Sequence, residues 1–517
     1  GAQSKPFRWM CQRDGVAYFE GNDGNLGGEL WRTDGTPDGT FLVQDLWAGP
    51  AASQPGGGAA KWLPDGRFLF TGHKDATYNL FISDGTDVGT KVVMEIEDGS
   101  RLELTLNGNV FLSSRDNLHG VEPWITDGTV QGTSMLIDIA PGAKDSNPGR
   151  FTPFGAIGIF TAWDDAHGAE LWRTDGTAEG TTLVKDLYPG TSNSDPYKFI
   201  VAWPYVYFVA VAPEMGREIW RTDGTPDGTI LIKDINHGPA ESEPYELTDL
   251  DGVLFFSAKG SEHGEELWRS DGTPEGTRLV KDIYPGEIGS EPYHIVSMNG
   301  HVYFGAKTQE NGVELWRSDG TEQGTILLDD IWKDYTSNPS SNPHELAAMN
   351  GTLFFVANDF EHGNELWRTD TSPAGVVMVR DIFPGPASSD PHDLIGVGGY
   401  LYFGADDGTN GDELWRTDGT PEGTAIVQDY ARGPGNSGPK NIVSYRDTVY
   451  FVSWRADDGE ELCKVFDGSI KCVRDIAAKE ASSNPRELVV VGDNLYFRAN
   501  DGLHGEELWV TSGVPAI

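Results

Sequence analysis

One line of sequence recurs along the chain at a dominant spacing of 48 residues, and this repeat limits the folds that are possible. Its fullest form is Glu-Leu-Trp-Arg-Thr-Asp-Gly-Thr. Repeats of 20–50 residues predict one structural unit per copy rather than ordinary globular domains. There are eleven copies, and their Trp position holds Trp31, Phe81, Trp124, Trp172, Trp220, Trp268, Trp316, Trp367, Trp415, Cys463 and Trp509.

Each copy reads as four short strands, here termed a, b, c and d. In the sixth copy the predicted strands span 243–250, 253–259, 266–270 and 277–283. The adjacent side chains of Leu267 and Trp268 point to opposite faces of strand c, and both are large and apolar. Both faces of such a sheet must be covered. Four antiparallel strands in about 40–50 residues, packed on both faces, are typical of a β-propeller blade.

The repeat therefore predicts an all-β fold, a large β-propeller of ten or eleven four-stranded blades. We expect residues 1–517 to form a single ring of eleven repeats, because the 48-residue register is unbroken from the third to the seventh copy. The last copy stops after strand c, which predicts an incomplete last blade. Two smaller tandem propellers are the alternative, because most propellers have about 4–8 blades.

The repeated line resembles the ELWxxDGT repeat family, and the resemblance covers essentially the whole chain. Full copies stand at 29–36, 170–177 and 413–420, whereas the copy at 122–129 carries Pro123 in place of Leu. The resemblance implies a secreted or cell-surface protein of the hyalin-like kind. It supplies no catalytic residue.

Charge excludes one class of partner. The chain has 80 acidic and 38 basic residues, a net charge of −42. Affinity for nucleic acid comes mainly from Lys and Arg at the phosphates, so we expect no nucleic-acid partner. No run approaches the ~18 apolar residues of a membrane-spanning helix. The balance favours a self-repelling protein that attracts cations.

Two cysteines flank a hairpin signal. Asp467-Gly468 is a two-residue turn sequence, and pairing outward from it places Cys463 opposite Cys472. We predict a disulfide there and hence an extracellular, secreted or surface location; two buried free thiols are the alternative. Cys11 has no evident partner. The chain begins at Gly1 without Met, from which we expect that a signal peptide has been removed.

The loop between strands b and c carries a recurring Asp-x-x-His/Asn-Gly-x-Glu pattern. Carboxylates with loop carbonyls suit a hard cation, so the pattern predicts bound Ca²⁺, with His as a neighbouring hydrogen-bond partner. The candidate metal ligands are Asp23, Asp116, Asp164, Asp359, Asp407, Asp501, Glu122, Glu170, Glu365, Glu413 and Glu507. The histidines, which are candidate ligand-binding residues, are His119, His167, His263, His362 and His504.

A structural interpretation of the same residues is favoured. Asp and His cap the loop while Glu pairs with an Arg, and pairs such as Arg173 with Asp186 form a ladder between blades. The Asp-Gly-Thr segment between strands c and d is likewise interpreted as a turn, in which Asp caps backbone amides and Thr satisfies local groups.

Aromatic residues in irregular loops are the remaining candidates for ligand binding. Trp47 extends the first d–a loop, and the seventh contains an insertion with Trp332 and Tyr335. Aromatic rings there could stack on sugars. The resulting hypothesis is a secreted, non-catalytic recognition or matrix protein that binds a glycan or protein. The alternative is a polysaccharide-acting hydrolase or lyase with its site on the same face or in the central channel.

Overall fold

The structure, a computed structural model, describes residues 8–56, 60–116, 118–333, 340–369, 375–478 and 480–512. Every regular element in these segments is a β-strand. None of them contains a helix that is long and apolar enough to cross a membrane. The chain divides into two compact units, Gly1–Pro244 and Tyr245–Ile517.

The first unit holds five four-stranded sheets. Their strands are β1 (Arg8–Arg13), β2 (Val16–Gly21), β3 (Glu29–Thr33) and β4 (Phe41–Gln44); β5 (Lys61–Trp62), β6 (Phe68–Lys74), β7 (Thr77–Ser83) and β8 (Lys91–Ile96); β9 (Arg101–Leu106), β10 (Asn109–Ser114), β11 (Glu122–Thr126) and β12 (Ser134–Met135); β13 (Gly149–Phe154), β14 (Ile157–Asp164), β15 (Gly168–Thr174) and β16 (Thr182–Lys185); and β17 (Tyr197–Ala202), β18 (Tyr205–Ala212), β19 (Gly216–Thr222) and β20 (Ile230–Lys233).

The second unit holds five four-stranded sheets and one of three strands. Their strands are β21 (Tyr245–Leu250), β22 (Val253–Gly260), β23 (Gly264–Ser270) and β24 (Arg278–Leu279); β25 (Tyr293–Met298), β26 (His301–Thr308), β27 (Gly312–Ser318) and β28 (Ile326–Leu327); β29 (His344–Met349), β30 (Thr352–Asn358), β31 (Asn364–Thr369) and β32 (Val376–Arg380); β33 (His392–Val397), β34 (Tyr400–Asp406), β35 (Asp412–Thr417) and β36 (Ala425–Ile426); β37 (Lys440–Tyr445), β38 (Thr448–Arg455), β39 (Gly459–Phe466) and β40 (Ser469–Cys472); and β41 (Arg486–Val491), β42 (Asn494–Asn500) and β43 (Glu506–Ser512).

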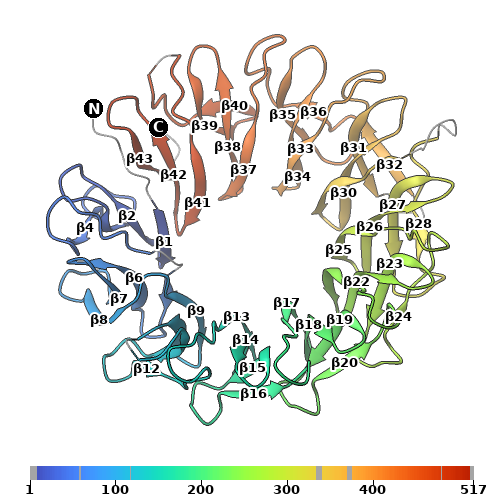
Figure 1. Ribbon diagram of the computed structural model, residues 1–517. Coiled ribbons are helices and arrows are strands. Elements are labelled where there is room, and N and C mark those ends of the chain that lie inside the picture. The colour runs from blue at the N-terminus through green and yellow to red at the C-terminus, as the bar shows by residue number, and fades with distance from the viewer. Residues whose placement is uncertain are drawn as a thin grey trace. The chain divides into compact units, whose positions relative to one another are not determined.

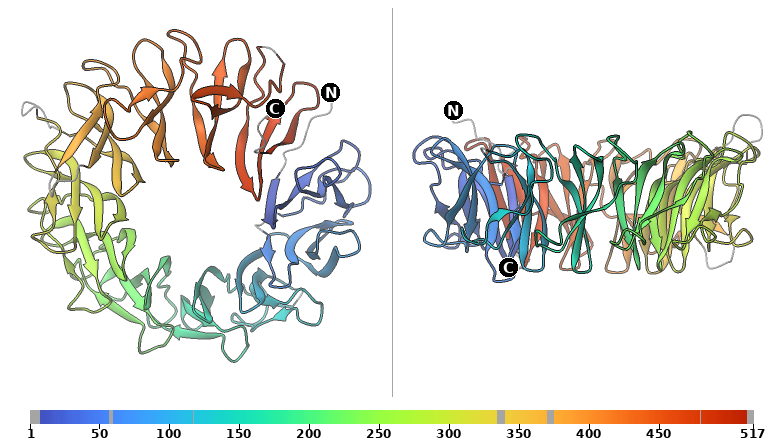
Figure 2. Two further views of the ribbon diagram at one scale, coloured as in Figure 1. Left: turned by 180° about the vertical axis from the view of Figure 1, so that it is seen from behind. Right: turned by 60° about the horizontal axis from the view of Figure 1, so that its bottom comes forward.

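Every sheet is an antiparallel meander of strands a to d in chain order. Within each unit, strand a lies on the inner side of the curve (Figure 1). Seen from the side, the loops gather at the two ends of the strands (Figure 2). These sheets are the blades of a β-propeller. The fold prediction is confirmed, including the last blade with three strands. The single ring over residues 1–517 stays a prediction.

Strand d is shorter than the sequence suggested. The predicted span 277–283 contains only β24, where Arg278 pairs with Arg269 and Leu279 with Trp268. In other blades the ladder shifts by one residue at this point, between Leu171 and Trp172 for example. The irregularity interrupts the regular pairing near the end of the segment, although the N–H of Val280 still donates to the carbonyl oxygen of Leu267 at 2.9 Å. The alternation of hydrophobic residues could not reveal it, because the apolar pattern continues through the break.

The Leu-Trp pair places one large side chain on each face of a blade. Leu171 packs in a cluster with Phe208 and Trp220 of the following blade, whereas Trp172 packs with Ile139 of the preceding one. Leu171 is fully buried and Trp172 is 7% exposed. At about 25 cal/mol per Å² of buried apolar surface, these two contacts are a main source of cohesion between blades.

The hairpin of β39 and β40 has the predicted register. Cys463 pairs with Cys472, and Val465 pairs with Ile470. The turn residues Asp467 and Gly468 both have positive φ, 50° and 72°, as a type I′ turn requires. The disulfide Cys463–Cys472 is present. Cys463 stands at the Trp position of this copy, whereas Leu462 keeps the Leu position and packs with Leu495 and Phe497 of the following blade.

Candidate functional site

The c–d turn is stabilised by the Asp, Thr and Gly residues that recur in it. In the turn after β15, the backbone N and the Oγ1 of Thr177 donate to Asp175 Oδ1 at 2.9 and 2.7 Å. The N–H of Gly180 donates to Thr177 Oγ1 at 2.9 Å. A Cβ on Gly180 would lie 2.0 Å from Asp175 Oδ1, so this position requires glycine. The interpretation of Asp-Gly-Thr as a turn is confirmed.

The Asp of the b–c loop caps that loop. Asp164 Oδ1 accepts the N–H groups of Ala166 and His167 at 2.8 and 2.6 Å. The ring Nδ1 of His167 lies 2.8 Å from Asp164 Oδ2, and this hydrogen bond raises the pKa of His167. Equivalent contacts join Asp116 to His119, Asp359 to His362, Asp501 to His504, and Asp407 to Asn410. Asp23 accepts the backbone N–H groups of Asn25 and Leu26.

His263 departs from this arrangement because Gly260 stands where the loop Asp is expected. Its Nδ1 instead lies 2.9 Å from Oδ2 of Asp282, which follows strand d. Asn311 reaches the equivalent Asp330 in the same way, at 2.9 Å. The imidazole and amide of this repeat position therefore join two loops of one blade.

The Glu that opens strand c is buried under the connection to the next blade. Glu170 has no exposed surface. It accepts the N–H groups of Leu187 and Ser194 at 2.8 and 3.0 Å and the Ser194 hydroxyl at 2.6 Å. Burial raises the pKa of Glu170 to about 7, against the hydrogen bonds, which lower it. Equivalent carboxyl groups with a pKa of about 7 belong to Glu218, Glu266, Glu314, Glu365 and Glu413.

Two other predicted ligands complete this set. Glu122 is fully buried and accepts the Ser146 hydroxyl at 2.7 Å. Glu507 belongs to the three-stranded last blade and is exposed. In most blades the two carboxylates therefore have different structural roles. The Asp caps the b–c loop, and the Glu accepts hydrogen bonds beneath the d–a connection.

The expected pairing of the strand-c Glu with Arg is wrong, and so is the expected pair of Arg173 with Asp186. Arg173 Nη1 donates to the carbonyl oxygen of Gly224 in the next blade at 2.8 Å, and Asp186 Oδ2 accepts the N–H of Gly190. Lys185 Nζ likewise donates to Thr229 O at 2.8 Å. Basic side chains therefore join blades through carbonyl groups. The sequence suggested that opposite charges pair, but these basic side chains donate to backbone carbonyl groups of the neighbouring blade instead.

The serine that meets the buried Glu was missed from the sequence. Ser194 has no exposed surface, and its carbonyl accepts the N–H of Val211 in the next blade at 2.8 Å. A Ser-x-Pro signal marks it in most repeats, as in Ser194-Asp195-Pro196 and Ser290-Glu291-Pro292. The middle residue has positive φ, 46° at Asp195, which explains why the signal combines polar residues with proline.

The predicted calcium ligands do not converge on one position. Among the described residues, no group of three or more His, Cys, Asp or Glu side chains is placed to hold a metal ion. The Asp oxygens accept amides of their own loop, and the buried Glu oxygens accept amides and a hydroxyl. This donor set fits loop capping better than cation coordination.

The predicted aromatic residues contact the following blade. Trp47 lies with its ring centroid 5.8 Å from that of His73, and Trp332 lies 5.5 Å from Phe360. Both follow the buried aliphatic residue after strand d, where other repeats carry Tyr188, Tyr284 or Phe383. They are regular positions rather than special ones. Tyr335 lies outside the described residues.

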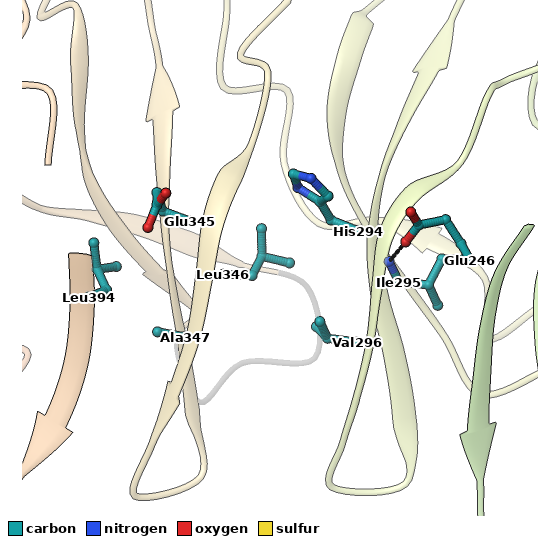
Figure 3. A pocket seen from close by; sticks show the side chains of 8 residues that line it. All are labelled: Glu246, His294, Ile295, Val296, Glu345, Leu346, Ala347 and Leu394. Atoms are coloured by element: carbon teal, nitrogen blue, oxygen red, sulfur yellow. Dashed lines mark hydrogen bonds between the residues drawn. The ribbon is translucent and has the colours of Figure 1, made fainter. Parts of the chain in front are cut away.

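A hollow of about 370 Å³ lies on strands a of the second unit. Its lining comes from β21, β25, β29 and β33 and comprises Glu246, His294, Ile295, Val296, Glu345, Leu346, Ala347 and Leu394. Figure 3 shows Glu345, His294 and Glu246 on three successive strands a, with the aliphatic residues beside them. Glu246 also accepts the N–H of Ile295 at 3.2 Å, the dashed line in the figure.

The polar residues of the hollow occupy one repeat position, the second residue of strand a. Glu246, His294 and Glu345 have φ of 53°, 51° and 52°. A β-bulge accompanies each of them, between Tyr245 and Thr248 for example. Bulges redirect a side chain out of the ladder, and non-glycine residues with positive φ concentrate where a side chain has a special task.

Comparisons with known proteins give only distant likenesses. No family model and no curated protein matches the chain. Among solved structures, a puromycin hydrolase is 12% identical with a TM-score of 0.29, over 68% of this chain and 58% of its own. The tricorn protease is 11% identical with a TM-score of 0.27, over 100% and 50%. A GH74 enzyme of Niastella koreensis is 9% identical with a TM-score of 0.29, over 98% and 83%. The chain thus spans about half the length of the tricorn protease, and none of these likenesses bears on activity.

Proposed function

We propose that this chain is a non-catalytic recognition protein of the extracellular space, which binds a cationic segment of a protein ligand in the hollow of its second unit. The observation that carries the proposal is the lining of that hollow, in which Glu246 and Glu345 flank His294 beside aliphatic side chains. A Lys or Arg side chain has the matching chemistry, an apolar stem and a cationic end.

The lining favours a protein over a glycan at this place. Sugar rings bind by stacking on Trp, Tyr or Phe, and none of these is among the lining residues. The two carboxylates attract cations, and the net charge of −42 adds long-range attraction for a basic ligand.

A binding role is better supported than catalysis. A polysaccharide hydrolase needs a carboxyl group that stays protonated near neutral pH and reaches its substrate. The groups whose pKa is raised to about 7, such as Glu266 and Glu314, are fully buried beneath the d–a connections. These buried carboxyl groups stabilise the fold and are out of reach of a substrate.

The extracellular location rests on the disulfide. Cys463–Cys472 is present, and disulfides persist mainly in oxidising compartments.

A labelled peptide of alternating Lys and Leu tests the proposal, with a Glu-Leu peptide of the same length as the charge control. Fluorescence anisotropy should show binding of the basic peptide and none of the acidic one. Glu246→Gln with Glu345→Gln should weaken binding about tenfold, because both attractive charges are lost. Glu322→Gln, which removes an exposed carboxylate outside the hollow, should leave affinity unchanged. An equal loss of affinity in both variants would mean that net charge alone drives binding, and it would refute the site.

A further inference from the structure

One imidazole, that of His294, lies between the two carboxylates of the hollow (Figure 3). His294 is the second residue of β25, and Glu246 of β21 and Glu345 of β29 occupy the same repeat position on the neighbouring strands. Imidazole side chains typically gain a proton between about pH 8 and 5, whereas ordinary carboxyl groups stay ionised above about pH 5. A protonated imidazole here would add one positive charge to a hollow that holds two negative ones.

The three side chains share a small space that is open to solvent. The hollow has a volume of about 370 Å³. Glu246 accepts the N–H of Ile295, the residue after His294, at 3.2 Å, and this bond holds its carboxylate against β25. His294 and Glu345 are exposed and Glu246 is half-buried, so protons and a ligand both reach them. The imidazole and the cation of a bound ligand therefore meet the same pair of carboxylates.

The strands packed directly beside His294 bring it few other titratable groups. On β25 itself the ring of Tyr293 has its centroid 5.0 Å from that of His294, and burial raises the pKa of Tyr293, so its hydroxyl stays neutral near pH 7. Strand β26 places Phe304 and Gly305 opposite the bulge. Strand β22 contributes Phe255 to the apolar cluster beneath.

Two further titratable groups stand on neighbouring strands a but outside the lining of the hollow. His344 precedes Glu345 on β29, and its Nδ1 lies 2.9 Å from the carbonyl oxygen of Asn342. Asp393 follows at the same repeat position on β33, with its carboxylate 3.5 Å from Nδ1 of His392. His344 therefore serves as the matched control for His294, because it is an imidazole on the next strand that does not line the hollow.

We infer that the hollow binds its cationic ligand in neutral solution and releases it on acidification, because a protonated His294 takes the place of the ligand's cation between Glu246 and Glu345. A neutral ring leaves both carboxylates to a Lys or Arg of the ligand. An imidazolium forms charge-assisted hydrogen bonds with carboxylates and repels a second cation beside it. This release rests on the proposed function, since it concerns the same site.

The first unit shows that the backbone accepts a cationic residue at this repeat position. Arg150 and Lys198 stand there with φ of 58° and 54°, close to the 51° of His294. Both accompany the same bulge in the ladder between strands a and b. His294→Lys is therefore compatible with the fold, and it places a permanent cation where acid would place a transient one.

Fluorescence anisotropy of the labelled Lys-Leu peptide tests the release at about pH 7.5 and about pH 5.5, in about 0.15 M salt to screen the net charge. The parent chain should bind about fivefold more weakly at the lower pH. His294→Gln should bind with similar affinity at both values, whereas His344→Gln should keep the difference of the parent. His294→Lys should bind at the higher pH about as weakly as the parent does at the lower.

Circular dichroism at both pH values confirms that each protein is folded, and buried carboxyl groups such as Glu266, with a pKa of about 7, favour the native state in acid. Equal affinity of the parent at the two pH values would overturn the release while leaving the peptide site intact. So would the same loss of affinity in His294→Gln as in the parent, or removal of the difference by His344→Gln. Absence of peptide binding at the higher pH would overturn the proposed function, and the release with it.

Discussion

Ser194 Oγ lies 2.6 Å from Glu170 Oε2 and 3.3 Å from the carbonyl oxygen of Ala169. A hydroxyl has one proton and two acceptors surround it here. Ser194 donates to Glu170 when that carboxyl is ionised, whereas a protonated Glu170 can donate to Ser194 and leave the hydroxyl proton for the carbonyl. The pKa of about 7 agrees with this arrangement. The same Glu–Ser contact recurs at Ser146, Ser242, Ser290, Ser341, Ser389 and Ser483.

Ser194→Ala should lower the free energy of unfolding by about 1–3 kcal/mol, because it leaves a buried carboxyl without its partner. Glu170→Gln should cost less, since the amide can still donate to Ser194 Oγ. Denaturant titration measures both. The control is Ser192→Ala, an exposed serine two residues away. Similar stabilities for the two serine variants would contradict the role of Ser194.

Stability should fall as pH rises from about 5 to 8. A carboxyl whose pKa is raised from 4.5 to about 7 by folding stabilises the native state below pH 4.5, and this contribution is lost as pH rises through 7. Each such group contributes a slope of up to about 1.4 kcal/mol per pH unit. His167 and His362 act in the same direction, because their pKa values are raised by Asp partners. Glu170→Gln should make the profile shallower, and an unchanged slope would argue against the titration of this group.

Removal of divalent cations should leave the unfolding midpoint unchanged. The capping carboxylates Asp164 and Glu170 already accept hydrogen bonds from amides, so no coordination energy is expected there. Thermal unfolding with EDTA, and then with added Ca²⁺, gives the answer. A ligand that binds only the native state must raise stability, so a midpoint that drops with EDTA would restore the calcium hypothesis.

Gly180→Ala should destabilise the chain by about 1–3 kcal/mol, because the new methyl group would overlap the Asp175 carboxylate. Gly149→Ala is the matched control. Gly149 has no positive φ, and a Cβ there meets nothing within 4 Å. Thermal unfolding of both proteins measures the difference, and equal midpoints would show that the turn relaxes around the methyl group.

The sequence predicted the blades because its strongest signals are local. The Leu267-Trp268 pair requires two covered faces, and the Asp467-Gly468 turn fixes the pairing of Cys463 with Cys472. Such inferences use only strand alternation and turn chemistry, which hold wherever the segment lies. The Asp-Gly-Thr turn was predictable for the same reason.

The candidate sites were harder to predict because they depend on contacts between repeats. Glu170 looked like a ligand on an exposed loop, but the d–a connection covers it, and only the Ser-x-Pro signal hinted at this.

The contacts between blades also bear on how such a chain changes length. Arg173 and Lys185 reach the carbonyl groups of Gly224 and Thr229, each one repeat ahead. A duplicated segment of one full repeat therefore brings both halves of every such contact with it, whichever residue it starts from. A deletion that is not a whole repeat separates donors from acceptors at its junction. Gain and loss of whole repeats is thus the change that this architecture tolerates best, and relatives should differ in length by multiples of about 48 residues.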